Sequence, residues 1–265
     1  LTSGGCKRIF CSRILCLALF VRACQVNMNL QEIRRRYSFP DPAREEYGDL
    51  LAVGGDLHPE RLIAAYSRGI FPWYDENSPI LWWSPDPRLI LRPEWLHIPR
   101  RLQRLARQHS FSATVNTAFE AVIRSCAGVE RTSGKGTWIV PEMIEAYIRL
   151  HRLGYAHSVE TWLGTRLVGG IYGVALGRIF FGESMFYTQS NASKLALLGL
   201  MQILQKSGFA FLDCQQTTAH MLRFGARETP RRMFVLQVEQ NIHKNPSELC
   251  WRPGPIKKVS CETSA

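Results

Sequence analysis

The feature that most constrains the fold is a run of strand-type segments in the second half of the chain, which leads into one long amphipathic helix. Three strands with turns between them are expected over His157–Trp162, Arg166–Ala175 and Arg178–Glu183. The helix follows over Ala192–Ser207, and Gly208 ends it. A strand, a short helix and a final strand are then expected over Phe209–Asp213, Thr217–Phe224 and Met233–Val238. This order favours helices packed on a mostly antiparallel sheet, so the sequence predicts an α+β fold.

The first third of the chain is punctuated by glycine and proline. A strand at Leu50–Val53 and a helix at Pro59–Tyr66 are expected there. Prolines near the following apolar segments argue against regular strands, so we expect Trp73, Trp82 and Trp83 on constrained loops or edges. Three more helices are expected: a basic one at Arg100–His109, one at Asn116–Cys126, and one that begins at Pro141.

These elements divide the chain into four parts. Residues 28–99 are expected to form a small N-terminal α/β domain, and residues 100–240 a larger second domain. Residues 1–27 are expected to be a non-native or disordered extension, and residues 241–265 a C-terminal tail. The apolar run Ile14–Val21 is far shorter than the roughly 20 residues that span a bilayer, so no membrane association is expected.

The charge and the cysteines are concentrated at the two ends of the chain. Of the formal charge of +11, residues 28–240 keep +5, a modest positive field that is compatible with a polyanionic partner. Two isolated cysteines, Cys126 and Cys214, lie in this body, which suggests a reducing compartment and predicts a cytoplasmic protein. The seven histidines are scattered and no CxxC pair occurs, so no metal site is expected.

The sequence Asp213-Cys214-Gln215 at the end of an apolar strand is a candidate reactive site. On a strand, Asp213 and Gln215 point to one face and Cys214 to the other. A carboxylate beside an amide can orient an amine and accept its proton. The alternative is a helix cap and a polar turn before Thr217.

Two further polar groups lie near strand or helix ends. Glu183 ends an apolar strand, so a buried carboxylate there needs a partner. Asn191, Ser193 and Lys194 open the long helix, whose free N–H groups and dipole suit a phosphate of a substrate. Simple capping of the helix by Asn191 is the alternative.

Nine sequence blocks occur in order along the chain. The first three are Leu50–Leu57, Gly69–Trp73 and Trp82–Arg88. The other six are Gly136–Ile139, Ala156–Glu160, Gly169–Gly173, Gly182–Phe186, Asn191–Lys194 and Asp213–Gln215. Together they resemble the bacterial leucyl/phenylalanyl-tRNA–protein transferase family, from about Phe39 to Phe234. Any one block is a weak signal, but nine in order are specific.

The resemblance implies an enzyme that moves Leu, Phe or, less well, Met from an aminoacyl-tRNA. The acceptor is a protein whose N-terminus begins with Arg or Lys, and the product is a degradation signal. The second domain is implied to be acetyltransferase-like (GNAT-like), with no metal or organic cofactor. A monomer is expected.

The resemblance also assigns site residues. The family's catalytic positions fall on Asp213, Gln215 and Glu183. Its aromatic substrate contacts fall on Trp73, Trp138 and Tyr147. The amino-acid pocket should include Met185 and Ile171, and the family often has Met at the latter position. The loop Glu130–Lys135 near Trp138 is slightly longer than usual for the family.

Two binding surfaces are expected beside this site. A basic track on the Arg100–His109 helix suits tRNA phosphates, although a solvated helix face explains it equally well; it consists of Arg100, Arg101, Arg104 and Arg107. The acceptor's basic residue needs a negative subsite, for which Glu183, Asp213 and Glu160 are candidates.

The sequence leaves the proton route and the reaction class open. In one hypothesis Asp213 polarises Gln215, which orients the attacking amine. In the other, Asp213 or Glu183 holds the acceptor cation while a departing tRNA hydroxyl carries the proton. Rival classes are a CoA-dependent N-acyltransferase, a thiol hydrolase that uses Cys214 and His220, and a non-catalytic tRNA-binding module.

Overall fold

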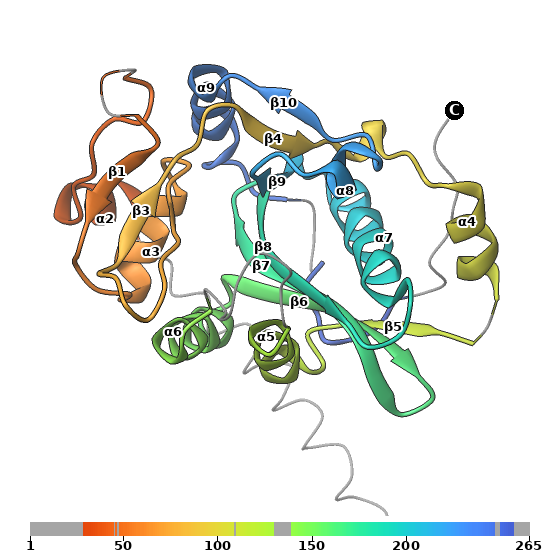
Figure 1. Ribbon diagram of the computed structural model, residues 1–265. Helices are drawn as coiled ribbons and strands as arrows, with labels where there is room; N and C mark the ends of the chain where they lie inside the picture. The colour runs from red at the N-terminus through yellow and green to blue at the C-terminus, as the bar shows by residue number, and fades with distance from the viewer. Residues whose placement is uncertain are drawn as a thin grey trace, which may run out of the picture.

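The computed structural model contains a small and a large β-sheet with helices on both faces of the larger one (Figure 1). It describes residues 29–44, 46, 48–108, 110–129, 139–246 and 250–256. The expected extension at residues 1–27, the loop Glu130–Lys135 and Trp138 therefore lie outside the described residues. In the described ranges, no helix combines the length and apolar character that a membrane span requires.

The small sheet has three antiparallel strands in the order β1-β3-β2. Its strands are β1 (Leu50–Val53), β2 (Phe71–Pro72) and β3 (Leu81–Trp83), and helices α2 (Leu30–Arg36) and α3 (Pro59–Tyr66) accompany it. The expectation of irregular structure at Trp82 and Trp83 was wrong, because both lie in the central strand β3. The nearby prolines lie outside that strand, before it at Pro79 or after it at Pro85 and Pro87, or, like Pro72, in an edge strand where a missing N–H is tolerated.

The large sheet has eight strands in the order β10-β4-β9-β8-β7-β6-β5-β11. In chain order they are β4 (Arg88–Leu91), β5 (Ser112–Val115), β6 (Ala156–Leu163), β7 (Arg166–Leu176), β8 (Ile179–Tyr187), β9 (Phe211–Gln215), β10 (Arg227–Thr229) and β11 (Gly254–Pro255). Neighbouring strands are antiparallel except β8 and β9, which are parallel and joined through helix α7 (Ala192–Lys206). The predicted α+β class with a mostly antiparallel sheet is confirmed.

Helices cover both faces of this sheet (Figure 1). The helices besides α7 are a 3-10 turn η2 (Pro93–Trp95), α4 (Arg100–Arg107), α5 (Phe119–Ala127), α6 (Pro141–Arg152), α8 (Ala219–Leu222) and α9 (Arg231–Asn241). One cluster of buried hydrophobic residues lies on the side of α5 and α6, and we call it the α6 core. It includes Tyr66, Tyr147, Phe181 and Phe234. A second cluster of buried hydrophobic residues lies on the side of α7, and we call it the α7 core. It includes Ile171, Phe180, Leu197 and Leu212.

The expected final strand at Met233–Val238 was wrong, because this segment lies inside helix α9. Phe234, Val235 and Val238 are buried, whereas Met233 and Leu236 are exposed. Burial at positions i, i+1 and i+4 is the pattern of a helix with one apolar face. A short apolar run rich in valine fits a strand equally well, so periodicity alone did not decide between them.

Strand β4 lies in the part of the chain expected to form the N-terminal domain, but it pairs with β9 and β10 of the large sheet. Its residues Leu89 and Leu91 pack in the α7 core, and Ile90 packs in the α6 core. The two parts of the chain therefore share one sheet, and the domain boundary at residue 100 stays a prediction.

Candidate active site

Two β-bulges in neighbouring strands form the candidate site. The register between β7 and β8 skips Glu183, and the register between β4 and β9 skips Cys214. A bulge adds one residue to a strand and redirects the side chains beside it. Opposite the first bulge, a Cβ on Gly173 would lie 2.1 Å from the carbonyl oxygen of Phe181, so the close approach of β7 and β8 requires glycine.

Glu183 is the centre of a buried hydrogen-bond network. Its Oε1 accepts from the Tyr66 hydroxyl at 2.7 Å and from Gln215 Nε2 at 3.0 Å. Its Oε2 accepts from the Tyr147 hydroxyl at 3.0 Å, and the hydroxyls of Tyr66 and Tyr147 are also bonded to each other. Tyr66, Tyr147 and Glu183 thus make three contacts between oxygen atoms, but the two phenol groups supply only two hydrogens for them. All three can be hydrogen bonds only when Glu183 carries a proton.

Burial has the largest effect on the acidity of this network. It raises the pKa of Glu183 to about 7, although the hydrogen bonds from Tyr66 and Tyr147 act in the opposite direction. Burial, followed by the charge of Glu183, also raises the pKa values of both tyrosines well above the ordinary value. The tyrosines therefore remain hydrogen-bond donors, while the carboxyl group can gain or lose a proton near neutral pH.

Asp213 is held by an arginine that the sequence analysis did not single out for the site. Arg88 of β4 donates from Nε to Oδ1 at 2.8 Å and from Nη2 to Oδ2 at 2.6 Å, and both side chains are fully buried. Asp213 Oδ1 also accepts the main-chain N–H of Gln215 at 2.9 Å. Asp213 thus contacts the Gln215 backbone, while the Gln215 side-chain amide bonds to Glu183.

The predicted alternation at the end of β9 agrees with the structure. Asp213 and Gln215 both lie toward the α6 core side, where Arg88 and Glu183 are their partners, and Cys214 packs against the α7 core. Gln215 has φ 63°, a left-handed conformation that is uncommon for a residue with a side chain. Its position therefore depends on the bulge and on the bond to Asp213.

The expected amino-acid pocket residues lie on the opposite face of the sheet. Ile171 and Met185 are direct cross-strand partners, and both pack in or against the α7 core. Without the bulge, Glu183 and Met185 would share a face, since they are two residues apart. The pairing of β8 with β9 ends at Phe181 opposite Asp213, so the two strands separate just where Glu183 and Gln215 stand.

The N-terminus of α7 differs from a simple capped helix. Asn191 has a left-handed backbone with φ 69° and makes no side-chain capping bond. Its Oδ1 accepts from Lys194 Nζ at 2.9 Å, and Ser193 is buried. The capping alternative is therefore not observed, and the phosphate site at this helix end stays a prediction.

Among the expected substrate contacts, Tyr147 is fully buried, whereas Trp73 and the arginines of the basic helix are accessible. The side chain of Trp73 directly follows β2 and is exposed, with its ring edge-on to Trp83 at 5.9 Å. The basic helix is confirmed as α4, and its four predicted tRNA contacts are all exposed: Arg100, Arg101, Arg104 and Arg107.

Two other candidates, Glu160 and Cys214, are hydrogen-bonded to groups outside the Glu183 network. Glu160 of β6 is fully buried and accepts hydrogen bonds from Ser158, Thr114 and Thr117 at 2.5 to 3.4 Å. For Cys214, burial raises the pKa of the thiol well above its ordinary value, which makes a nucleophilic thiolate unfavourable.

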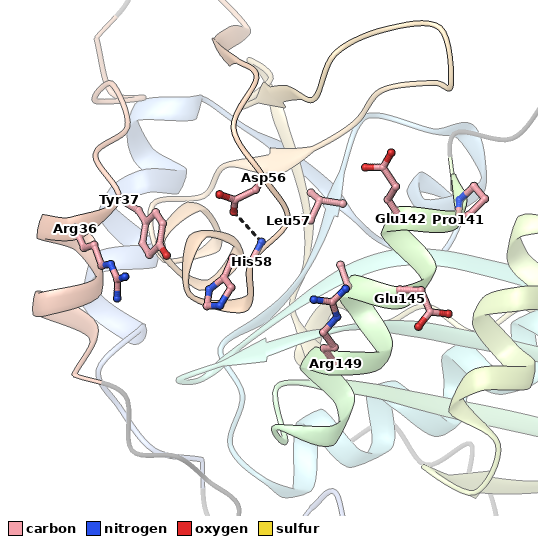
Figure 2. A pocket seen from close by; sticks show the side chains of 10 residues that line it. Arg36, Tyr37, Asp56, Leu57, His58, Pro141, Glu142, Glu145 and Arg149 are labelled. Atoms are coloured by element: carbon pink, nitrogen blue, oxygen red, sulfur yellow. Dashed lines mark hydrogen bonds between the residues drawn. The ribbon is translucent and has the colours of Figure 1, made fainter.

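Two cavities lie away from the network. The larger, of about 700 Å³, lies between the end of α2, the loop before α3 and the outer face of α6 (Figure 2). Glu142, Glu145 and Arg149 of α6 line one side of it, and Asp56 and His58 line the other. The smaller, of about 310 Å³, lies between α4, β5, α7 and β11. The residues that line these two cavities do not include the three predicted catalytic residues.

The sequence reasoning missed Tyr66 and Arg88 as parts of the site. A signal existed for Arg88, because two apolar strands each carry one charge of opposite sign, Arg88 in β4 and Asp213 in β9. Charges in buried strands are expected to pair. Tyr66 gave no comparable signal, since a tyrosine at the end of an apolar helix is an ordinary core residue.

Comparison with known proteins defines the chain as an aminoacyltransferase. Residues 90–239 match the family described as leucyl/phenylalanyl-tRNA protein transferase, and residues 55–86 match the N-terminal domain of that enzyme. The chain belongs to the leucyl/phenylalanyl-tRNA–protein transferase family, as the nine sequence blocks indicated.

Curated relatives with that name cover most of this chain. The protein of Anaeromyxobacter sp. (strain K) is 51% identical over 227 residues, which is 86% of this chain and 97% of the relative. That of Anaeromyxobacter sp. (strain Fw109-5) is 54% identical over 82% of this chain and 92% of its own length. That of Nitratidesulfovibrio vulgaris (strain DP4) is 58% identical over 74% of this chain and 84% of its own length.

Solved structures are more distant. L-PGS from Bacillus licheniformis superposes with a TM-score of 0.40 at 10% identity, over 60% of this chain and 66% of that chain. A GCN5-related N-acetyltransferase from Kribbella flavida gives a TM-score of 0.34 at 14% identity, over 63% of this chain and 59% of that one.

Proposed function

We propose that this protein transfers Leu or Phe, and less readily Met, from an aminoacyl-tRNA to the N-terminal amine of proteins that begin with Arg or Lys. The product would be a protein marked for degradation. The observation that carries the proposal is the Glu183 network, in which one buried carboxyl group with a pKa of about 7 is hydrogen-bonded by two tyrosines and by Gln215.

The chemistry requires positioning and a proton acceptor rather than a covalent nucleophile. An aminoacyl ester is already activated, and an α-amine has an ordinary pKa of about 7.7–8.0, so part of it is unprotonated at neutral pH. The amine nitrogen bonds to the acyl carbon while the bond between that carbon and the ribose oxygen breaks. Glu183 takes the proton that the nitrogen releases and passes it to the departing ribose oxygen, so a peptide and free tRNA result.

The separation of β8 and β9 suits this reaction. The donor's side chain would lie toward the α7 core against Ile171 and Met185, on the face opposite Glu183. The acceptor amine would approach Glu183 and Gln215 where the strands part, beyond the pair of Phe181 and Asp213. Two reactants held on either side of one gap in the sheet gain the rate advantage of proximity.

Charge supports the choice of partners. A carboxylate such as Glu183 favours a cationic acceptor residue in a chain with a formal charge of +11, and α4 presents four exposed arginines to an RNA. Phosphate contacts of this kind do not depend on RNA sequence. The contacts of Trp73, Trp138 and the α7 N-terminus with substrate belong to the same proposal.

Transfer of labelled Leu from Leu-tRNA to peptides that differ only in the first residue tests the proposal. Peptides that begin with Arg or Lys should be labelled, and a peptide that begins with Ala should not. Asp213→Asn and Gln215→Ala should each slow single-turnover transfer and leave tRNA binding unchanged. Normal rates in both variants would remove these residues from the assignment.

Two of the three rival classes give different results in the same experiments. A CoA-dependent acyltransferase would bind acetyl-CoA in calorimetry and be indifferent to tRNA. A non-catalytic module would bind tRNA and transfer nothing to any peptide. Either outcome would overturn the proposed function.

A further inference from the structure

Arg88 is a buried cation, and burying its charge away from water costs the folded protein free energy. It enters the sheet at the start of β4, is 0% exposed, and pairs with Asp213 through two parallel hydrogen bonds of 2.8 and 2.6 Å. Its guanidinium lies over the rings of Phe71 at 4.8 Å and Phe234 at 4.5 Å. A buried ion pair is a weak source of stability, because both charges lose their hydration. Stability alone therefore gives no clear reason for this pair.

The pair is connected to Glu183 by one more residue. Asp213 Oδ1, which Arg88 holds, accepts the main-chain N–H of Gln215 at 2.9 Å. Gln215 stands in the left-handed region with φ 63°, where its backbone needs such support. From that position its side-chain Nε2 reaches Glu183 Oε1 at 3.0 Å. Movement of Arg88 would therefore be transmitted to the amide that contacts Glu183.

Charged and titratable groups on five elements lie on or next to the Glu183 network. Helices α3 and α6 supply two tyrosine hydroxyls, and β7 supplies a third tyrosine that packs edge-on against the α6 one. Strand β9 supplies Asp213, whose charge acts to raise the pKa of Glu183, and β4 supplies Arg88, whose charge acts to lower it. These two opposing charges lie in contact with each other, so the effect of Arg88 offsets part of the effect of Asp213 on the pKa of Glu183 while the pair is intact.

We propose that Arg88 is a positioning residue of the transfer reaction: it neutralises Asp213 and fixes Gln215, and so leaves Glu183 as the carboxylate that exchanges a proton with the substrate. This inference rests on the proposed function for its reaction, but its structural part does not need a substrate. It also assigns different roles to the two acidic residues, Asp213 and Glu183. Asp213 supports Gln215 from inside the sheet, and Glu183 acts at the gap between β8 and β9.

Titration of Glu183 tests the charge relation directly. The carboxyl carbon of Glu183 would be followed by NMR in full-length protein labelled with ¹³C-glutamate and assigned with Glu183→Gln. Arg88→Met should move the Glu183 midpoint to higher pH by about one pH unit, because Asp213 is left without its counter-charge. Arg88→Met combined with Asp213→Asn removes both charges and should return the midpoint toward that of the wild type. An unchanged midpoint in Arg88→Met would overturn the inference.

A matched control separates this effect from loss of a buried arginine as such. Arg231 of α9 is 5% exposed and donates to the carbonyl oxygens of Gly48 and Ser84, outside the Glu183 network. Arg231→Met should lower the midpoint temperature of thermal unfolding, and it should leave the pH midpoint of the Glu183 titration unchanged. If both Met variants moved the titration equally, the effect would be structural and the inference would fail.

If Arg88→Met does not fold, Arg88→Lys provides a second test of the same inference. Lysine preserves the charge but cannot make the paired contacts of a guanidinium. We expect kcat for Leu transfer to fall about tenfold with KM for Leu-tRNA unchanged, because Gln215 is less well fixed while donor binding is not affected. Wild-type kcat in Arg88→Lys would refute the positioning role. A wild-type protein that transfers no amino acid would instead refute the proposed function, and the NMR result would stand independently.

Discussion

Replacement of Glu183 by glutamine should change how the stability of this protein depends on pH. The side chain is 8% exposed, and its pKa in the folded protein is about 7 against an ordinary value of 4.5. The folded state therefore holds the proton more tightly than the unfolded state does. Stability from the protonated group is fully present below pH 4.5 and is lost as the pH rises through about 7. Glutamine keeps the shape but cannot ionise.

The size of the effect follows from the two pKa values. One pH unit corresponds to about 1.4 kcal/mol, so the interval from 4.5 to about 7 corresponds to about 3 kcal/mol of unfolding free energy. Between pH 4.5 and pH 8, wild type should lose about this amount relative to Glu183→Gln. Other carboxyl groups titrate in both proteins and cancel in the difference.

Urea unfolding of both proteins at closely spaced pH values measures that difference. Glu145→Gln is the matched control, because Glu145 lies on the exposed face of α6 and pairs with Arg124 at the surface. Its difference from wild type should stay nearly flat over this pH range, as expected for a solvated ion pair. A flat difference for Glu183→Gln as well would refute the reasoning, since it would show that burial does not perturb this carboxyl group.

Three further predictions concern the site, the RNA surface and the C-terminal segment. Tyr147→Phe removes a hydrogen bond that lowers the pKa of Glu183, so the pH at which transfer reaches half its maximum should rise, as measured by a pH–rate profile. Neutralising Arg101 and Arg104 should reduce the slope of log affinity for tRNA against log salt by about 2, whereas an unchanged slope would make α4 a solvated face. Trp251→Ala removes a ring stacked on a buried imidazole at 4.2 Å and should cost about 2–3 kcal/mol in urea unfolding without changing single-turnover transfer.

Local patterns in the sequence were sufficient for most elements. Helix α3 was predicted with its observed bounds, Pro59–Tyr66, because a proline at its first turn and Gly69 after its end are strong boundary signals. The long helix α7 and the strands β6 to β8 were also found, since each has clear periodicity and glycine at its turns. The prediction for the α9 segment was wrong because its apolar residues are compatible with the pattern of a strand as well as that of a helix.

The resemblance to a family predicted Glu183, Asp213 and Gln215 as catalytic residues, but it could not assign their contacts. Which partner each carboxylate has depends on strands that are far apart in sequence, since Arg88 and Asp213 are separated by 125 residues. The two bulges are also invisible in sequence, because one extra residue in a strand changes the register without changing the apolar pattern.

The sequence by itself determined the class of fold, the position of the main helices and strands, and the family to which the chain belongs. Those depend on local periodicity, on turn residues and on ordered motifs, all of which are properties of neighbouring residues. Only the tertiary structure decided that Glu183 is buried between two tyrosines, and that Arg88 neutralises Asp213. Proton affinity depends on the charges and solvent around a group, and these are set by elements that meet only after folding.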